Sequence, residues 1–293
     1  MTGTIPSATA DDRSDQALSW RGPGPGRPDL PIPPARQPLL HRGLMRKKWR
    51  YVGFYGDEVM LCAAIARIGP FSHSFWSVWD RIEGKVWEHT RLRPGGQEVV
   101  LDGPVVEIRT PNVRAAIRFG ELEPIEVIAP SGKGWAWTRK RAGVPVSGRI
   151  ITDGKIREVR GFGVDDESAG YHQRNVKWKW SAGIGEATDG RALGWNLVEG
   201  INDSPQQSER AIWLEGVPGE PGPVSFDGLD AIRFGEPDEG LVFDFGGAER
   251  KRHDNFGLIR SDYTHRFGTF TGRLDGIELA SAAGVTEEHA VVW

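Results

Sequence analysis

Along most of the chain, short apolar or alternating runs are separated by turn residues, and helical periodicity is hard to find. In the run VRAAIRFG, Val113, Ala115, Ile117 and Phe119 fall on one face of a strand, because successive side chains point to opposite faces. This alternation is typical of half-buried strands in barrels and sandwiches. The predicted strands are residues 48–55, 59–68, 74–81, 85–92, 98–102, 105–110, 113–120, 125–129, 134–141, 147–152 and 155–163.

Three short motifs occur twice in the same order. The pairs are AIRFGE at 116–121 and 231–236, SGRIITDG at 147–154 with TGRLDG at 271–276, and GVDDES at 163–168 with GVTEEH at 284–289. The Asp-Gly pair that ends the second motif is a strong hairpin signal. The repetition predicts two copies of one antiparallel unit, which removes its exposed edges by closing on itself. We therefore expect an all-β protein of two tandem lipocalin-like antiparallel β-barrels, or strongly bent half-barrels, at residues 44–168 and 169–293.

Residues 1–43 precede the first predicted barrel and include RGPGPGRPDLPIPPARQP. Prolines remove backbone donors and glycines add chain entropy, so we expect a Pro/Gly-rich arm that is disordered or extended. A short segment such as Leu39-Leu40 is able to dock on the folded body.

Composition places the 293-residue chain among soluble globular proteins, with 38% hydrophobic and 26% charged residues. A net charge of -3 gives no reason to expect a nucleic-acid partner. The start of the chain does not resemble a signal peptide, and no apolar run is long enough to span a membrane. We expect a cytoplasmic protein in which Cys62, the only cysteine, packs as a small hydrophobic residue. The sequence does not predict an oligomeric state.

Candidate chemistry concentrates in residues 171–213, which mix tryptophans with His, Arg, Asn and Glu. Strand alternation puts one set of side chains on an inward face: His172, Arg174, Val176, Trp178 and Trp180. The residues between them belong in water. A charge on the inward, tryptophan-lined face needs a partner.

The following run, RALGWNLVEG, places Trp195 and Glu199 on one face, so Glu199 is a candidate partner for Arg174 or for a ligand. One interpretation is a cavity with aromatic walls and a few polar groups, the usual composition of a small-molecule site. The other is that aromatic side chains fill the barrel while Arg174 and Glu199 form a satisfied buried pair. The polar residues exceed what packing alone requires, and we favour a site formed by His172, Arg174, Asn196, Glu199, Asn202 and Glu209.

A second aromatic run, FSHSFWSVWDR, places Phe75 and Trp79 on one strand face with His73, and Trp76 on the other. We expect His73 to be a hydrogen-bonded core residue. Trp76 joins the candidate ligand-binding residues.

Acidic clusters occur at 165–167 and 287–289. Carboxylates beside aromatic walls can have raised pKa values and act as proton donors, but we favour solvated turns here. No HExxH or CxxC spacing occurs, and no Rossmann or P-loop glycine motif lies in a suitable context. We therefore assign no metal and no nucleotide cofactor.

The segments GFGVDDESAGYHQR, WKWSAGIG, DGRALGWNLVEGIND and SERAIW resemble the domain-of-unknown-function family 2804. More distantly, residues 161–170 are similar to the GxGxxDHSWG signature of AttH-like and carotenoid 1,2-hydratase-like proteins. That resemblance implies two lipocalin-like barrels and hydratase, cyclase or pericyclase chemistry on hydrophobic molecules. Glu167 stands where the signature has His, and Ala169 where it has Trp.

These observations lead to the hypothesis of a cofactor-free protein that binds a hydrophobic isoprenoid, polyene or acyl compound and acts on it as a hydratase, cyclase or isomerase. Asp166, Glu167 or Glu199 would donate a proton, His172 would accept one and Arg174 would orient the substrate. The predicted ligand-binding residues are Trp76, Trp178, Trp180, Trp195 and Asn196. The alternative is a non-catalytic lipid-binding or carrier protein, and a third possibility is a structural protein with solidly packed barrels.

Overall fold

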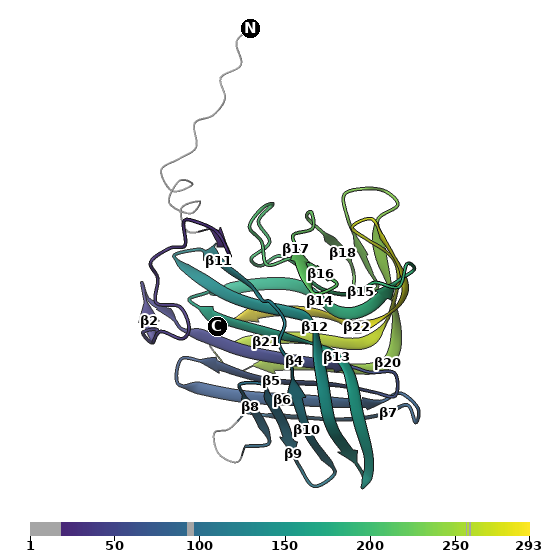
Figure 1. The fold of residues 1–293 in the computed structure, drawn as a ribbon. Helices are drawn as coiled ribbons and strands as arrows, with labels where there is room; N and C mark the ends of the chain where they lie inside the picture. Colours follow the sequence, from purple (N-terminus) through teal and green to yellow (C-terminus); the bar gives the residue numbers. More distant parts are fainter. Residues whose placement is uncertain (1–18, 93–96, 256, 258) are drawn as a thin grey trace.

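The computed structural model describes residues 19–92, 97–255, 257 and 259–293. Within these ranges the regular structure consists of strands, without a helix. Two large antiparallel sheets curl strongly and pack against each other (Figure 1). The predicted all-β, lipocalin-like fold is thereby confirmed, and among the described residues its two units are strongly bent half-barrels whose edge strands do not pair.

The first sheet has the strand order β7-β6-β5-β4-β13-β12-β10-β9-β8, with β11 and β1 added beside β12. Its strands are β1 (Trp20–Arg21), β4 (Lys47–Tyr55), β5 (Val59–Ile68), β6 (Phe71–Asp80), β7 (Lys85–Arg91), β8 (Val99–Asp102), β9 (Val105–Arg109), β10 (Val113–Phe119), β11 (Ile125–Ser131), β12 (Gly134–Thr152) and β13 (Lys155–Gly170). Across the described part of the chain, no ladder joins β7 to β8, so this barrel is open along one side.

The second sheet has the order β17-β16-β15-β14-β22-β21-β20-β19-β18. Its strands are β14 (Asn175–Ala187), β15 (Ala192–Glu199), β16 (Ala211–Leu214), β17 (Val217–Gly219), β18 (Ser225–Asp227), β19 (Ala231–Arg233), β20 (Gly240–Asn255), β21 (Arg260–Leu274) and β22 (Ile277–Val292). A separate short hairpin, β2 (Leu40–His41) with β3 (Leu44–Met45), precedes β4.

Local patterning explains these strands. In β10 the four apolar side chains are buried and the arginines between them are exposed, as alternation predicts. The predicted strands 134–141 and 147–152 are one long strand, β12, with a register shift between Ala142 and Val144. The bulge lets one strand pair with β11 at its start and with β10 at its end.

Two of the three repeated motifs occupy equivalent places. The Asp-Gly pairs connect β12 to β13 and β21 to β22, and both aspartates have positive φ. GVDDES lies on β13, which pairs with β4, and GVTEEH lies on β22, which pairs with β14. The two copies of AIRFGE lie in different places. The first copy begins in β10, which pairs directly with β12. The second begins in β19, which is separated by β20 from β21, the counterpart of β12. The hexapeptide therefore reflects a shared strand pattern and not equivalent strands.

The described part of the arm packs onto the body. Trp20 and Ile32 are buried in a small core with Trp135, Trp137 and Tyr171. Leu39 and Leu40, which were expected to be able to dock, are exposed. Residues 1–18 of the predicted arm lie outside the described residues.

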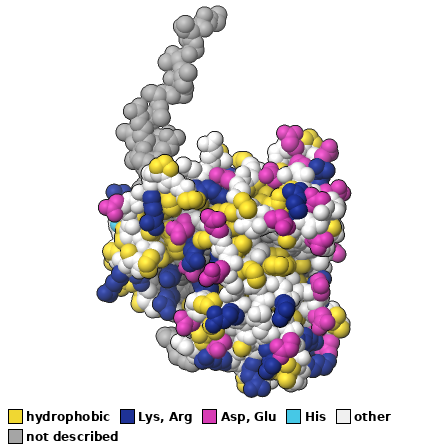
Figure 2. Space-filling model, viewed as in Figure 1, with side chains coloured by type: hydrophobic (Ala, Val, Ile, Leu, Met, Phe, Trp, Pro, Cys, Tyr) yellow, Lys and Arg dark blue, Asp and Glu magenta, His cyan; other side chains and the backbone are white. Residues whose placement is uncertain are grey.

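Three larger hydrophobic cores organise the fold. One fills the first sheet, one fills the second, and the third contains residues from both sheets. Cys62 lies in this third core, where burial raises its pKa to about 12. Figure 2 shows charged side chains of both signs scattered over one face of the molecule, with hydrophobic side chains between them. In the described chain, no helix is long and apolar enough to cross a membrane.

Candidate functional site between the two sheets

The first sheet contributes a row of side chains to the interface. Lys140 on β12 is directly opposite Asp166 on β13, and Asp166 is opposite Tyr51 on β4. Residues that are directly opposite in neighbouring strands share a face. All three are buried, and they form a polar row on the face of the first sheet that contributes to the core shared by both sheets.

The second sheet contributes an equivalent row. Arg250 on β20 is opposite His265 on β21, His265 is opposite Glu287 on β22, and Glu287 is opposite Trp180 on β14. All four are buried. In the repeated motifs, Asp166 and Glu287 occupy the same position. The internal repeat thus places one carboxyl group on each side of the interface.

The two rows touch through aromatic side chains. The ring of Tyr51 meets the ring of Trp180 edge-on, with centroids 5.2 Å apart. The Tyr51 hydroxyl lies 3.1 Å from His265 Nε2 and 3.2 Å from the Tyr55 hydroxyl. Burial lowers the pKa of His265 to about 3, so this ring is neutral at physiological pH.

Lys140 links Asp166 to a second carboxylate. Its Nζ lies 2.5 Å from Asp166 Oδ2 and 3.4 Å from Glu209 Oε1. Burial raises the pKa of both carboxyl groups, although Lys140 opposes the increase. Burial acts to lower the pKa of Lys140, but the two carboxylates outweigh it and leave the pKa raised. One ammonium between two buried carboxyls favours retention of a proton by the carboxyl pair.

Glu287 is the other buried acid. Trp178 Nε1 donates to Glu287 Oε1 at 3.0 Å, and the Tyr263 hydroxyl donates to Oε2 at 2.9 Å. Burial raises the pKa of Glu287 to about 7, with the two hydrogen bonds opposing the rise and Asp166 contributing to it. At neutral pH, a substantial fraction of Glu287 therefore carries a proton inside an aromatic environment.

A string of rings meets this acid at Trp178 and Tyr263, and we call it the aromatic rim. Its members are Trp49, Phe75, His172, Trp178, Tyr263, His289 and Trp293. Neighbouring ring centroids are 4.4 to 6.4 Å apart. Most of these side chains are partly exposed, whereas His172 and Tyr263 are buried. Through Trp178 and Tyr263, the rim connects Glu287 to partly exposed rings.

Several predicted residues meet in this region. Trp178 and Trp180 are inward-facing, as alternation predicts. Trp180 Nε1 donates to Asn196 Oδ1 at 2.8 Å, and Asn196 Nδ2 donates to the backbone oxygen of Glu209 at 2.8 Å. Asp166 is thus one of the buried acids, Trp178 contacts Glu287, and Trp180 and Asn196 are linked to the backbone of Glu209.

His172 is fully buried but is not connected to the carboxyl groups by a hydrogen bond. Its two ring nitrogens have no hydrogen-bond partner among the described residues. Burial, with smaller contributions from Lys47 and Lys140, lowers its pKa to about 3. The His172 ring packs against the Trp49 ring, with centroids 4.9 Å apart, and forms part of the aromatic rim.

Two predicted orientations are wrong. Arg174 is exposed, because β14 begins at Asn175 and alternation does not extend back to Arg174. Glu199 is opposite Lys179, on the face away from Trp180, and its Oε2 accepts a hydrogen bond from the Phe226 backbone at 3.0 Å. The predicted Arg174–Glu199 pair therefore does not form, and Glu199 instead fixes the start of β18.

Three other predicted residues lie outside this cluster. Trp76 belongs to the core of the first sheet, and Trp195 to the core of the second. Glu167 is on the opposite face of β13 from Asp166, where its Oε1 lies 3.5 Å from Arg50 Nε. These positions follow from strand alternation, which separates adjacent residues onto two faces.

Sequence reasoning missed several residues of the site. The segments 165–167 and 287–289 lie within strands, so the expectation of solvated turns is wrong. The alignment of GVDDES with GVTEEH was the available signal for Glu287. Lys140, His265 and Arg250 carried no comparable signal, because only the strand pairing brings them beside the two carboxyls.

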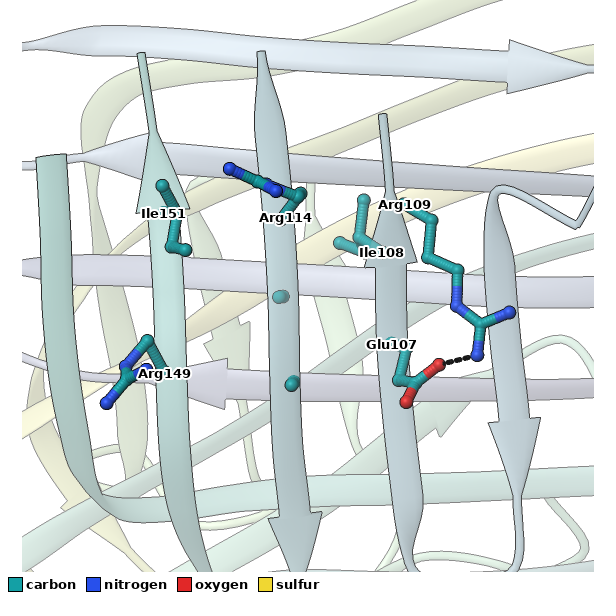
Figure 3. A pocket seen from close by; sticks show the side chains of 8 residues that line it. Glu107, Ile108, Arg109, Arg114, Arg149 and Ile151 are labelled. Atoms are coloured by element: carbon teal, nitrogen blue, oxygen red, sulfur yellow. Dashed lines mark hydrogen bonds and ion pairs between the residues drawn. The ribbon is translucent and has the colours of Figure 1, made fainter. Parts of the chain in front are cut away.

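Two surface pockets formed by described residues lie away from this site. One, of about 210 Å³, is formed on β9, β10 and β12 by Arg109, Arg114, Arg149 and their neighbours (Figure 3). The other, of about 440 Å³, lies beside Lys177 and Arg260. Among the described residues, no group of three or more His, Cys, Asp or Glu side chains is arranged to hold a metal ion.

The fold and the shared polar core define a two-barrel, all-β protein with acidic groups buried at the barrel interface. The chain belongs to the family described as domain of unknown function (DUF2804), whose model matches residues 105–293. No curated protein matches the chain.

Solved structures with a related arrangement have low sequence identity. A protein described as an AttH from Nitrosomonas europaea is 15% identical, with 88% of this chain and 98% of that chain covered and a TM-score of 0.49. Kievitone hydratase from Nectria haematococca is 7% identical, with 84% and 88% covered and a TM-score of 0.49. CghA with Sch210972 is 10% identical, with 84% and 88% covered and a TM-score of 0.40. At these identities, no functional role is transferred from these proteins to a residue of this chain.

Proposed function

We propose that this protein is an enzyme that binds a hydrophobic small molecule, such as an isoprenoid, polyene or acyl compound, between its two sheets. It acts on this molecule by cofactor-free acid–base chemistry. The observation that carries the proposal is Glu287, a carboxyl group with a pKa of about 7 that is buried beside an aromatic rim. A group that titrates near the working pH can both give and take a proton.

In the proposed reaction, the O–H bond of Glu287 breaks and a C–H bond forms with the π electrons of a polyene or enone. The faces of Trp178 and Tyr263 stabilise the positive charge that develops on the substrate. Addition of water to the cation gives hydration, attack by a second double bond gives cyclisation, and loss of a neighbouring proton gives isomerisation. The Glu287 carboxylate takes up the released proton, which restores the acid at the end of the reaction.

Substrate access depends on the aromatic rim. The rings of Trp178 and Trp293 lie 6.4 Å apart, and both side chains are partly exposed. In the proposal, these side chains change rotamer when a ligand enters. The ligand then replaces ring–ring contacts with contacts of similar apolar character.

Solvent extraction of the purified protein and mass spectrometry test this proposal. Extracted compounds and a panel of polyenes and enones are incubated with the protein in D₂O. We expect the wild type to transfer deuterium to a carbon atom of at least one compound, and Glu287→Gln to lose that transfer. Glu288→Gln is the matched control, because Glu288 is the next residue on β22 and pairs with Lys177 at the surface. A ligand that stays unlabelled and chemically unaltered would instead indicate a carrier.

A further inference from the structure

Arg250 is a buried cation that lacks an ion-pair partner among the described residues. Its side chain is 4% exposed. Nη2 donates to Thr90 Oγ1 at 2.6 Å, while Nε has no hydrogen-bond partner within the described ranges. A buried guanidinium without a carboxylate loses hydration that one hydroxyl does not replace. This position therefore favours an anion that is supplied from outside the chain.

Aromatic rings hold the guanidinium at the rim. Its central carbon lies 4.0 Å from the ring centroid of Phe75 and 4.9 Å from that of Tyr263. These contacts fix the guanidinium plane and leave its polar edge as the group that lacks partners. Phe75 is partly exposed, so one of the rings that cover the guanidinium lies at the surface.

The same rings connect Arg250 to the acid. Tyr263 lies under the guanidinium and donates its hydroxyl proton to Glu287. Arg250 and Glu287 are separated by one strand, β21, so their backbones are about 10 Å apart at ordinary strand spacing. A ligand that reaches both groups has its anionic oxygen and its reacting carbon several bonds apart.

We infer that Arg250 anchors a carboxylate of the substrate, which makes the substrate an unsaturated hydrophobic carboxylic acid. This inference rests on the proposed function, because it places the anchor and Glu287 in one site. The bidentate edge of the guanidinium matches the two carboxylate oxygens. Charge neutralisation then occurs on binding, and the apolar part of the substrate lies along the rim.

Equilibrium binding of cis-parinaric acid and its methyl ester at pH 8 tests the anchor. We expect the wild type to bind the acid at least about tenfold more tightly than the ester, since only the acid pairs with the guanidinium. Arg250→Gln removes this preference by weakening acid binding, while ester binding changes less than about threefold. Lys251→Gln, an exposed charge on the same strand, leaves both affinities unchanged.

Arg250→Lys keeps the charge and retains part of the preference, which separates charge loss from misfolding. Three results would overturn the anchor. The wild type could bind acid and ester equally, it could bind neither compound, or Arg250→Gln could keep the wild-type preference for the acid. A wild type that transfers deuterium but binds acid and ester equally would overturn the anchor alone. A wild type that prefers the acid but never transfers deuterium would contradict the proposed enzyme activity alone.

Discussion

Two carboxyl groups at equivalent places in the repeat have different surroundings. Asp166 lies beside the Lys140 ammonium, whereas Glu287 lies opposite His265, whose pKa is lowered by burial to about 3, and Arg250 lowers the pKa of Glu287 less than burial raises it. A neighbouring cation favours the charged form of a carboxyl, and a neutral neighbour does not. Burial raises the pKa of both groups, and the rise is opposed by Lys140 at Asp166 and by hydrogen bonds from Tyr263 and Trp178 at Glu287.

Substitution of Glu287 changes how stability depends on pH. The pKa of Glu287 is raised from 4.5 to about 7, so the folded state binds a proton that the unfolded state releases between these values. The wild type therefore loses stability as pH rises from 4.5 to 7. Glu287→Gln removes this loss, and its gain in unfolding free energy over the wild type grows from near zero at pH 4 to about 3 kcal/mol above pH 8.

Urea denaturation across pH 4 to 9 measures this difference. Glu288→Gln serves as the control, and we expect its curve to run parallel to that of the wild type. A constant offset between wild type and Glu287→Gln at every pH would mean that Glu287 has an ordinary pKa.

At the scale of strands, the motifs GVDDES and GVTEEH each contain a glycine where two strand backbones approach closely, together with the buried carboxyl group of the site. A Cβ added to Gly284 would overlap the carbonyl oxygen of Ala182 on β14, and one added to Gly163 would overlap that of Gly53 on β4. Each glycine lies three residues before its carboxyl. The close strand pairing therefore helps to fix where Asp166 and Glu287 project.

Gly284→Ala disturbs this pairing. Because the added methyl group meets backbone atoms, β22 or β14 must shift, and we expect a loss of about 1–3 kcal/mol in unfolding free energy. Gly222→Ala is the control, since a Cβ there meets no atom within 4 Å. Equal stabilities of the two variants would contradict the close approach.

Strand patterns predicted much of the fold, because alternation is local. The faces of β10 and of Trp178 and Trp180 follow directly from it. Arg174 was misplaced because the pattern does not mark where β14 begins. The pairing of Lys140 with Glu209 depends on contact between the two sheets, which local periodicity does not encode.

At the scale of the whole molecule, the two sheets share one core. The interface cluster includes Met60 and Val164 from the first sheet and Phe267 and Val285 from the second. Separation of the sheets would expose this apolar surface and the charged groups beside it. Neither sheet is expected to unfold while the other keeps its structure.

Scanning calorimetry of the whole chain examines this coupling. We expect one transition, with a van't Hoff enthalpy close to the calorimetric enthalpy. Two resolved transitions would show that the sheets are independent and would weaken the case for a site that both must form.

The most direct test of the acid role is the rate of deuterium transfer to a bound substrate between pH 5 and 9. For the wild type, transfer should fall as pH rises through about 7, because the protonated form of Glu287 is lost. Glu287→Gln should show no transfer at any pH, and Glu288→Gln should follow the wild type. Transfer by Glu287→Gln at the wild-type rate, or a wild-type rate independent of pH, would contradict the account.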